Sequence, residues 1–237
     1  MQWARPTSAH WQQLGRRQAL LLLLIGLLLE GPGRWLLRPH VHDLLPQTPS
    51  FDLRLRLAVE GGFVAIFLVA ASMAGGLAAS GMRVRHWSRL EWLLLGVVGG
   101  IEMVVVLVLT AGRWGRLPGP GGILGLVAWI LSESLFGFNQ ETGFRGLLMT
   151  GLLRLSGPFP AIVLNSLLFT FGPLHGGGHL ADWFAHPAQH VPMIVAVAVS
   201  GLFFSCVRYV TDNVLLVGIL HGLVNGLLNG SALALRG

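Results

Sequence analysis

Long apolar runs are the feature of this sequence that most restricts its fold. They recur along the whole chain, and short arginine-bearing segments separate them. An α-helix needs about 20 apolar residues to cross the roughly 30 Å hydrocarbon core of a bilayer. The sequence therefore predicts an all-α, polytopic transmembrane bundle of about seven helices, or eight, with runs at about 18–37, 57–80, 91–111, 122–138, 158–172, 190–210 and 213–230.

Composition excludes a soluble globular protein. Hydrophobic residues make up 53% of the chain and charged residues only 11%, and the mean hydropathy is +0.68. Soluble domains carry about 25% charged residues, so this chain lacks the polar surface to face water on all sides. Its formal charge of +6 comes from arginines that lie mainly between apolar runs. There they meet anionic headgroups, so we expect a lipid bilayer as partner and no nucleic acid.

We expect residues 1–237 to form a single integral membrane domain, because no repeat or low-complexity linker divides them. Residues 139–155 continue the fourth apolar run as an amphipathic extension. The lone Cys206 excludes an intramolecular disulfide and a two-cysteine metal site. The arginine-, glycine- and leucine-rich composition is typical of a GC-rich prokaryote, which predicts a multi-pass protein of the inner (cell) membrane.

Polar residues inside apolar runs are the candidates for function. A charged side chain at the centre of a transmembrane helix costs about 2.5 to 3.5 kcal/mol, so it requires a partner or a role. In this chain such residues gather in the second half. They are Glu133, Gln140, Glu141 and Arg145 on the fourth segment, His175 at the end of the fifth, and His221 and Asn225 on the last.

The spacing of these residues favours a site between helices. Glu141 and Arg145 are four residues apart with the acid first, which on an α-helix is the favourable order for an ion pair. His221 and Asn225 repeat the interval on the last segment, and Phe171 and His175 repeat it at the end of the fifth. Three segments thus each present a four-residue pair, as sites built inside helical bundles do.

The same residues resemble three motifs of the CPBP family of intramembrane proteases, which includes type II CAAX prenyl endopeptidases and bacteriocin-processing, Abi-like proteins. Gln140–Arg145 resembles the family's Glu-Glu-x-x-x-Arg motif. Phe171–His175 resembles Phe-x-x-x-His, and His221–Asn225 resembles His-x-x-x-Asn. Their order and separations also fit, and the resemblance covers about 122–230, the CPBP-like protease core.

The resemblance implies a glutamic intramembrane endopeptidase, with its site between the fourth, fifth and last helices. In similar proteins the first glutamate of the pair and the histidine of the second motif, here His175, activate a water molecule. His221 and Asn225 correspond to the groups that stabilise the oxyanion, and Glu141 and Arg145 to a supporting pair. Such chemistry needs a base to deprotonate water and preorganised donors for the developing negative charge.

Position 140 departs from the family pattern. Where the family has its catalytic glutamate, this chain has Gln140, which is nearly isosteric but accepts no proton. The chain is therefore expected to be impaired or inactive as a peptidase. Either an engineered change or natural variation explains Gln140, and a natural variant would be non-catalytic or use another base. Two glutamates are candidates for such a base. Glu133 lies about 10 Å from position 140 along a helix axis, and the side chain of Glu141 points about 100° round the helix from that of position 140.

A metal site is an alternative that the sequence leaves open. The loop 174–190 is rich in histidine, but three consecutive glycines between His175 and His179 argue against a zinc-binding helix. In the core, His175, His221 and Glu141 could in principle ligate zinc. No cofactor is the first expectation, and zinc is the alternative. Rhomboid-type serine chemistry is disfavoured because its Gly-x-Ser-Gly motif is missing.

Two classes of function follow. The first is an endopeptidase that hydrolyses a peptide bond of a membrane-embedded or lipid-modified protein, at a C-terminal anchor, a sorting or leader segment, or a lipid-modified tail. The second is a non-catalytic membrane scaffold or immunity-type protein that binds peptide with the same fold. A transporter is disfavoured, since no inverted repeat is evident. The residue at position 140 discriminates between the first two.

Overall fold

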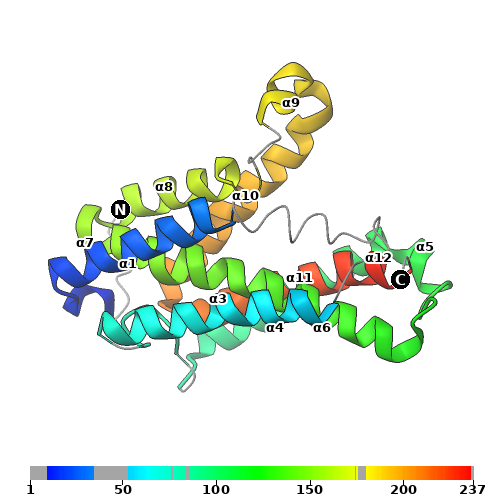
Figure 1. Ribbon diagram of the computed structural model, residues 1–237, viewed down its shortest axis with the longest axis horizontal. Helices are drawn as coiled ribbons and strands as arrows, with labels where there is room; N and C mark the ends of the chain where they lie inside the picture. The colour runs from blue at the N-terminus through cyan, green and yellow to red at the C-terminus, as the bar shows by residue number, and fades with distance from the viewer. Residues whose placement is uncertain are drawn as a thin grey trace. The chain divides into compact units, whose positions relative to one another are not determined.

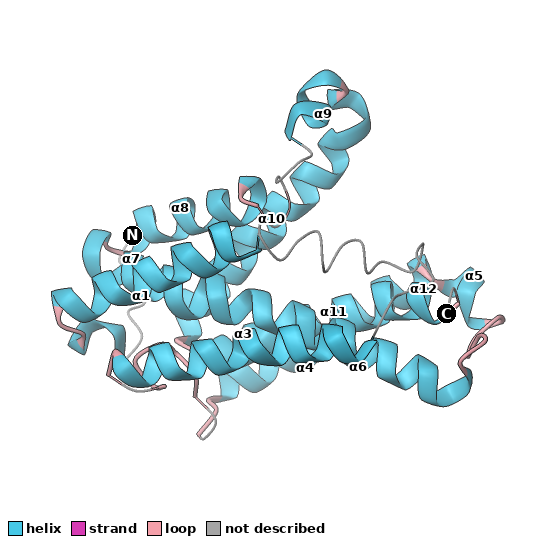
Figure 2. Ribbon diagram, in the orientation of Figure 1, coloured by secondary structure: helices cyan, strands magenta, loops and turns pink. Residues whose placement is uncertain are grey.

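The computed structural model describes residues 10–34, 53–75, 77–83, 86–173, 175 and 180–235. Within these ranges the regular structure is helical and no strand occurs, which confirms the predicted all-α class (Figure 2). The principal helices are α1 Arg16–Leu28, α3 Leu53–Met73, α4 Arg89–Leu109, α6 Gly122–Glu141, α7 Met149–Ser156, α8 Pro158–Phe171, α10 Pro187–Thr211 and α11 Val214–Asn225 (Figure 1). Shorter elements are η1 His10–Gln13, η2 Leu29–Gly33, α5 Ala111–Trp114, η3 Thr142–Leu148, α9 Leu180–Ala185, η4 Gly226–Gly230 and α12 Ser231–Ala234.

Helix length and hydropathy make this a membrane protein. Four described helical stretches are long and apolar enough to span a bilayer: Arg89–Leu109, Gly122–Ser156, Pro187–Thr211 and Val214–Ala234. They cover four of the predicted runs. Leu57–Met73 and Pro158–Phe171 are apolar but shorter. The N-terminal run is helical through η2, and its residues from 35 onward lie outside the described part. A total of about seven spans stays a prediction.

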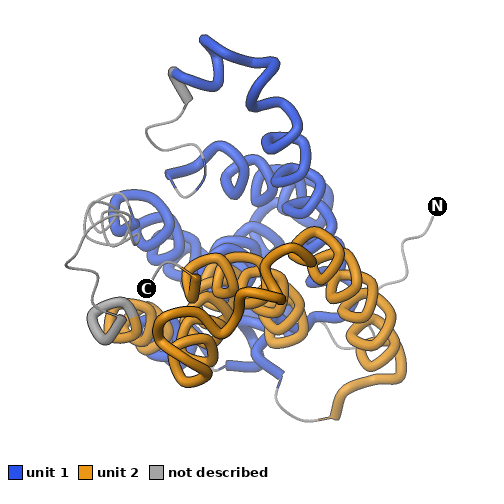
Figure 3. Tube along the Cα trace, turned by 90° about the vertical axis from the view of Figure 1, so that its right-hand side faces the viewer, with its two compact units in different colours: residues 1–38, 66–83, 142–214 blue, residues 39–65, 84–141, 215–237 orange. Residues whose placement is uncertain are grey.

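The chain divides into two compact units (Figure 3). Unit 1 comprises Met1–Arg38, Ile66–Arg83 and Thr142–Val214, and unit 2 comprises Pro39–Ala65, Val84–Glu141 and Leu215–Gly237. One boundary falls between Glu141 and Thr142, where the α-helix α6 gives way to the π-helix η3. The motif residues are therefore described within two separate units. The expectation of a single domain stays a prediction.

In unit 1, a buried arginine fixes the segment that carries the first motif. Arg208 on α10 forms an ion pair with Asp212, which ends that helix in a left-handed conformation. Its guanidinium also donates to Thr150 Oγ1 at 3.1 Å and to the main-chain oxygen of Arg145 at 3.3 Å. Because Arg208 is fully buried, each of these donors requires an acceptor. The π-helix η3 is thereby anchored to α10.

In unit 2, a stripe of glycines lets the last helix approach α6 closely. Gly218, Gly222, Gly226 and Gly230 recur every four residues along α11 and η4. A Cβ on Gly222 would lie 2.7 Å from the main-chain oxygen of Ser134, and one on Gly226 would lie 2.9 Å from that of Ile130. Small residues at this spacing are typical of tightly packed membrane helices. The stripe brings the two motif-bearing helices of unit 2 into backbone contact.

Candidate active site

Glu141 and His221 form a buried pair at the centre of unit 2. Glu141 is the last residue of α6 and is 0% exposed, and His221 on α11 is largely buried. The Nδ1 atom of His221 lies 2.6 Å from Glu141 Oε1. The close packing of α6 on α11 sets this distance, since a Cβ on Gly137 would lie 2.9 Å from the main-chain oxygen of His221. Two residues that are 80 positions apart thus meet at hydrogen-bond distance.

This pairing defines the tautomer of His221. An ionised carboxylate only accepts hydrogen bonds, so Nδ1 of His221 carries the proton and donates it to Glu141. In the neutral ring the other nitrogen, Nε2, then carries a lone pair. The partner of one ring nitrogen commonly sets the chemistry of the other in this way. The bond to Glu141 thus fixes both the orientation and the tautomer of the His221 ring.

Asn225 lies on the same side of α11, one turn after His221. Its Nδ2 atom lies 3.0 Å from the position that a Cβ on Gly137 would take, so its amide packs against the α6 backbone. Helix α11 ends at Asn225 and continues as the π-helix η4, just as α6 ends at Glu141 and continues as η3. Short π-helical turns inside α-helices are frequent at functional sites. Both motif helices of unit 2 change their winding directly after the motif residues.

Gln140 is also buried in unit 2, at 2% exposure. Its side-chain oxygen accepts no hydrogen bond from any residue that the structure describes. Buried amide oxygens are normally hydrogen-bonded, so this atom is a ready acceptor for a polar group that enters the site. An amide accepts no proton at neutral pH, however. Position 140 can thus orient a donor, but it cannot serve as a base.

Glu60 is a site neighbour that the sequence reasoning missed. It lies on α3 of unit 2 and is 1% exposed. Asn139, the residue before Gln140, donates through Nδ2 to Glu60 Oε2 at 2.6 Å. A glutamate inside the apolar run 57–80 was the signal that could have indicated it, because buried carboxylates in membrane helices require a partner. The bond fixes the last turn of α6 from the α3 side.

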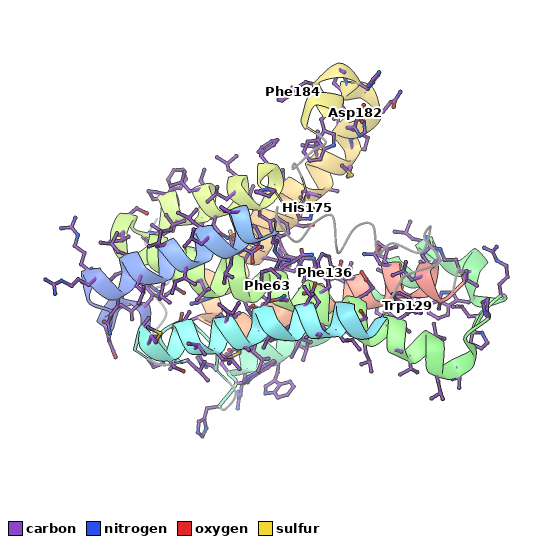
Figure 4. All side chains as sticks on the ribbon, in the orientation of Figure 1. Phe63, Trp129, Phe136, His175, Asp182 and Phe184 are labelled. Atoms are coloured by element: carbon purple, nitrogen blue, oxygen red, sulfur yellow. The ribbon has the colours of Figure 1, made fainter. Side chains whose placement is uncertain are left out.

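In unit 1, Arg145, Phe169 and His175 form a stack. Of the three, His175 is labelled in Figure 4. The guanidinium carbon of Arg145 lies 4.1 Å from the centre of the Phe169 ring, and the rings of Phe169 and His175 are 4.6 Å apart between centroids. Arg145 also donates to the main-chain oxygen of Gly201 at 3.0 Å. The Nδ1 atom of His175 lies 2.8 Å from the main-chain oxygen of Phe169. A carbonyl only accepts, so Nδ1 of neutral His175 carries the ring proton.

Phe169 is the aromatic residue of this stack, and the sequence reasoning named Phe171 instead. Phe169 is 2% exposed, whereas Phe171 is 44% exposed. The signal was the four-residue series Ala161, Asn165 and Phe169, which forms the buried face of α8. Phe171 lies off that face, so it does not line the stack.

The structure brings the six predicted site residues together in two groups. Gln140, Glu141, His221 and Asn225 belong to unit 2, with Glu141 bonded to His221. Arg145 and His175 belong to unit 1, and both contact Phe169. The predicted pairing of Glu141 with Arg145 stays a prediction, as does the assembly of all six into one site.

The histidine-rich loop shows two carboxylate contacts among its described residues. Asp182 on α9 accepts from His186 Nδ1 at 2.9 Å and lies 2.8 Å from His190 Nε2. The hydrogen bond from His186 is the main cause that lowers the pKa of Asp182. His179 lies outside the described residues. Across the described ranges, no three His, Cys, Asp or Glu side chains are arranged to hold a metal ion. The zinc alternative stays a hypothesis.

Comparison with known proteins agrees with the motifs. The model of the family described as type II CAAX prenyl endopeptidase Rce1-like matches residues 119–227. No curated protein and no solved structure matches the chain. The matched residues begin just before α6, end in η4 and contain all three motifs. Residues 119–227 therefore match the Rce1-like family model, which supports the resemblance to CPBP-type intramembrane proteases that the motifs predicted.

Proposed function

We propose that this protein is an intramembrane endopeptidase that hydrolyses a peptide bond of a membrane-associated protein. The observation that carries the proposal is the buried hydrogen bond between Glu141 and His221, inside a region that matches a protease family. A buried carboxylate and imidazole in apolar helices are costly unless they have a role. Hydrolysis supplies that role, since it needs a proton acceptor and a fixed dipole away from bulk water.

The proposed roles are carried over from the family resemblance, residue by residue. Following the family resemblance, position 140 and His175 hold the attacking water. His221 and Asn225 face the carbonyl oxygen that becomes negatively charged, and Glu141 and Arg145 support them. Water adds to the scissile carbonyl carbon, the C–N bond then breaks, and the products are a carboxyl group and an amine. No cofactor takes part, so a zinc chelator is expected to leave the rate unchanged.

The proposed substrates are membrane-embedded or lipid-modified polypeptides. The matching family is named for prenylated CAAX substrates, and four described helices are suited to a bilayer. Both facts favour a substrate that is already held at the membrane. A C-terminal anchor, a sorting or leader segment, or a lipid-modified tail meets this condition. The protein is proposed to act in the inner membrane of a prokaryotic cell.

Cleavage by the purified full-length chain tests this proposal. The chain with Gln140 is compared with its Gln140→Glu variant and with a Gln140→Glu/His175→Ala double variant, all in the same detergent. The substrates are a farnesylated CAAX peptide and a membrane-anchored peptide without a lipid, and products are identified by mass. We expect Gln140→Glu to cleave at least one of them, and the added His175→Ala to slow it by about 100-fold or more.

The matched control is Glu91→Gln, which makes a glutamate-glutamine exchange at another buried position. Glu91 accepts a hydrogen bond from the main-chain nitrogen of Ser88 at the start of α4, and glutamine also suits this capping position. The control is expected to leave cleavage unchanged. If no variant cleaves either peptide while both peptides bind, the protein is a non-catalytic scaffold and the proposal fails.

A further inference from the structure

Building on the proposed function, we propose that one face of α10 positions Arg145, the arginine of the first motif. None of the motif residues lies on α10, so the family resemblance gives this helix no role. Gly201, Ser205 and Arg208 are spaced by four and three residues, which places them on one face of the helix, and all three are buried. They are positioning residues, because they act on the proposed site only through Arg145.

The side chain of Arg145 is held by the main-chain oxygen of Gly201. Arg145 Nη2 donates to this oxygen at 3.0 Å, while the guanidinium carbon lies 4.1 Å from the centre of the Phe169 ring. A Cβ on Gly201 would lie 3.2 Å from Phe169 Cδ1 and would crowd that ring. Glycine at position 201 therefore lets both side chains approach the α10 backbone, where the guanidinium charge meets a carbonyl dipole.

Ser205 directs the same carbonyl toward Arg145. Its Oγ atom donates to the main-chain oxygen of Gly201 at 2.8 Å, which is a bond to the residue four positions earlier. Such serine bonds often bend a helix, and a bend turns the carbonyl outward, where an external donor can reach it. Asn165 on α8 donates through Nδ2 to Ser205 Oγ at 3.1 Å and fixes the direction of the hydroxyl. Asn165 and Ser205 are both 0% exposed, so water does not compete for these bonds.

The main chain of Arg145 is held by Arg208, two helical turns after Gly201. Arg208 Nε donates to the main-chain oxygen of Arg145 at 3.3 Å, and the ion pair with Asp212 keeps the Arg208 guanidinium in place. A Cβ on Gly81 would collide with this guanidinium, so the chain leaves room for it on the opposite side as well. Helix α10 thus holds Arg145 at both its main chain and its side chain.

A purely structural role explains this arrangement less well. Apolar residues of similar size often stabilise a protein as much as a buried ion pair does, and polar side chains inside membrane helices are costly. Here Asn165, Ser205 and Arg208 are all fully buried, and their bonds converge on one motif residue. A fixed positive charge assists catalysis only when it is preorganised, and a misplacement of about 1 Å can cost about 100-fold in rate.

The first measurement is of kcat and KM for cleavage of the same two membrane peptides by the full-length Gln140→Glu chain, with and without Ser205→Ala. The matched control is Ser156→Ala, because Ser156 makes the same bond to the residue four positions earlier, Leu152, at an exposed position of α7. We expect Ser205→Ala to lower kcat by about 10-fold with little change in KM, and Ser156→Ala to leave both unchanged. Arg208→Lys keeps the charge but loses the planar fork, so it should also lower kcat.

NMR of ¹⁵N-labelled arginine side chains gives a readout that a loss of stability alone does not move. It uses the full-length chain in detergent, and Arg145→Lys assigns the guanidinium signals of Arg145. We expect Ser205→Ala to shift these signals and Ser156→Ala to leave them in place. Thermal unfolding of every variant shows that the fold is retained.

The outcomes separate this proposal from the proposed function. If Gln140→Glu cleaves and the added Ser205→Ala keeps the full kcat, the positioning role is wrong, although the protease function stands. If Gln140→Glu cleaves neither peptide, the proposed function fails, and the Arg145 signals alone decide whether α10 holds this residue. Signals that do not respond to Ser205→Ala in a folded chain would overturn the proposal in either case.

Discussion

His221 in unit 2 and His175 in unit 1 are both fixed through Nδ1, but by different acceptors. His221 donates to a buried carboxylate at 2.6 Å, and His175 to a main-chain carbonyl at 2.8 Å. Either acceptor selects the tautomer with a basic Nε2. The carboxylate carries a net charge, whereas the main-chain carbonyl is only a dipole. The comparison shows that two histidines of the motifs are held in the same way by partners of different charge.

The largest effect is expected from His221→Ala. If His221 faces the developing oxyanion as proposed, its removal lowers kcat by about 10³-fold, the upper end for one oxyanion-stabilising group. Cleavage of the membrane peptide at saturating substrate concentration gives this ratio. A loss below about 10-fold in a folded variant would contradict the comparison.

A smaller loss is expected from His175→Ala. Because its partner is an uncharged carbonyl, His175 is expected to contribute about 10²-fold to kcat, the lower end of the same range. The two alanine variants are assayed side by side on one peptide. A larger loss of kcat in His175→Ala than in His221→Ala would contradict the comparison.

Gly222→Ala is expected to loosen the packing that holds the Glu141–His221 pair. Its added Cβ would lie 2.7 Å from the main-chain oxygen of Ser134, and overpacking of this kind costs about 1 to 3 kcal/mol. Thermal unfolding in detergent measures the loss. The matched control is Gly100→Ala on α4, whose added Cβ would meet nothing within 4 Å. Equal stability of the two variants would contradict the close contact of α6 and α11.

Phe169→Leu is expected to weaken the stack in unit 1 by about 1 kcal/mol, because the Arg145 guanidinium loses the aromatic face 4.1 Å away. Thermal unfolding again gives the change. The matched control is Phe171→Leu, at a side chain that is 44% exposed. Greater destabilisation of the control than of Phe169→Leu would contradict the stack.

The smallest effect is expected at Asp182, which lies outside the membrane-spanning helices. Its hydrogen bond from His186 lowers the pKa of its carboxyl in the folded protein. A lowered pKa stabilises the folded protein at every pH above the ordinary carboxyl pKa, near 4. That stability is lost as the pH falls through the lowered pKa. NMR titration of the carboxyl in the full chain measures it. An ordinary pKa, unchanged by His186→Ala, would show that the contact is not formed in solution.

The sequence was most informative where hydropathy decides the structure. Apolar runs predicted the membrane class and the positions of four long helices, since the bilayer requires a certain helix length. It was less informative on side-chain partners. The four-residue spacing led to the expectation of a Glu141–Arg145 pair, which stays a prediction. The hydrogen bond between Glu141 and His221, 80 residues apart, was not expected.

Helix contacts were the other part that local patterns did not reveal. The close approach that the glycines from Gly218 to Gly230 permit becomes evident only from the packing of α6 against them. Glu60 likewise becomes a site neighbour only through its bond to Asn139. Such contacts join segments far apart in the chain, so periodicity within one segment carries no information on them. Motif order still predicted the family whose model matches residues 119–227.

NMR of the full-length chain with ¹⁵N-labelled histidine rings, in detergent at neutral pH, tests the comparison most directly. His221→Ala and His175→Ala assign the two signals. The account expects both rings to carry their proton on Nδ1, and expects Glu141→Gln to alter the His221 signals but not those of His175. A proton on Nε2 of neutral His221 would contradict the account, because Nδ1 could then not donate to Glu141.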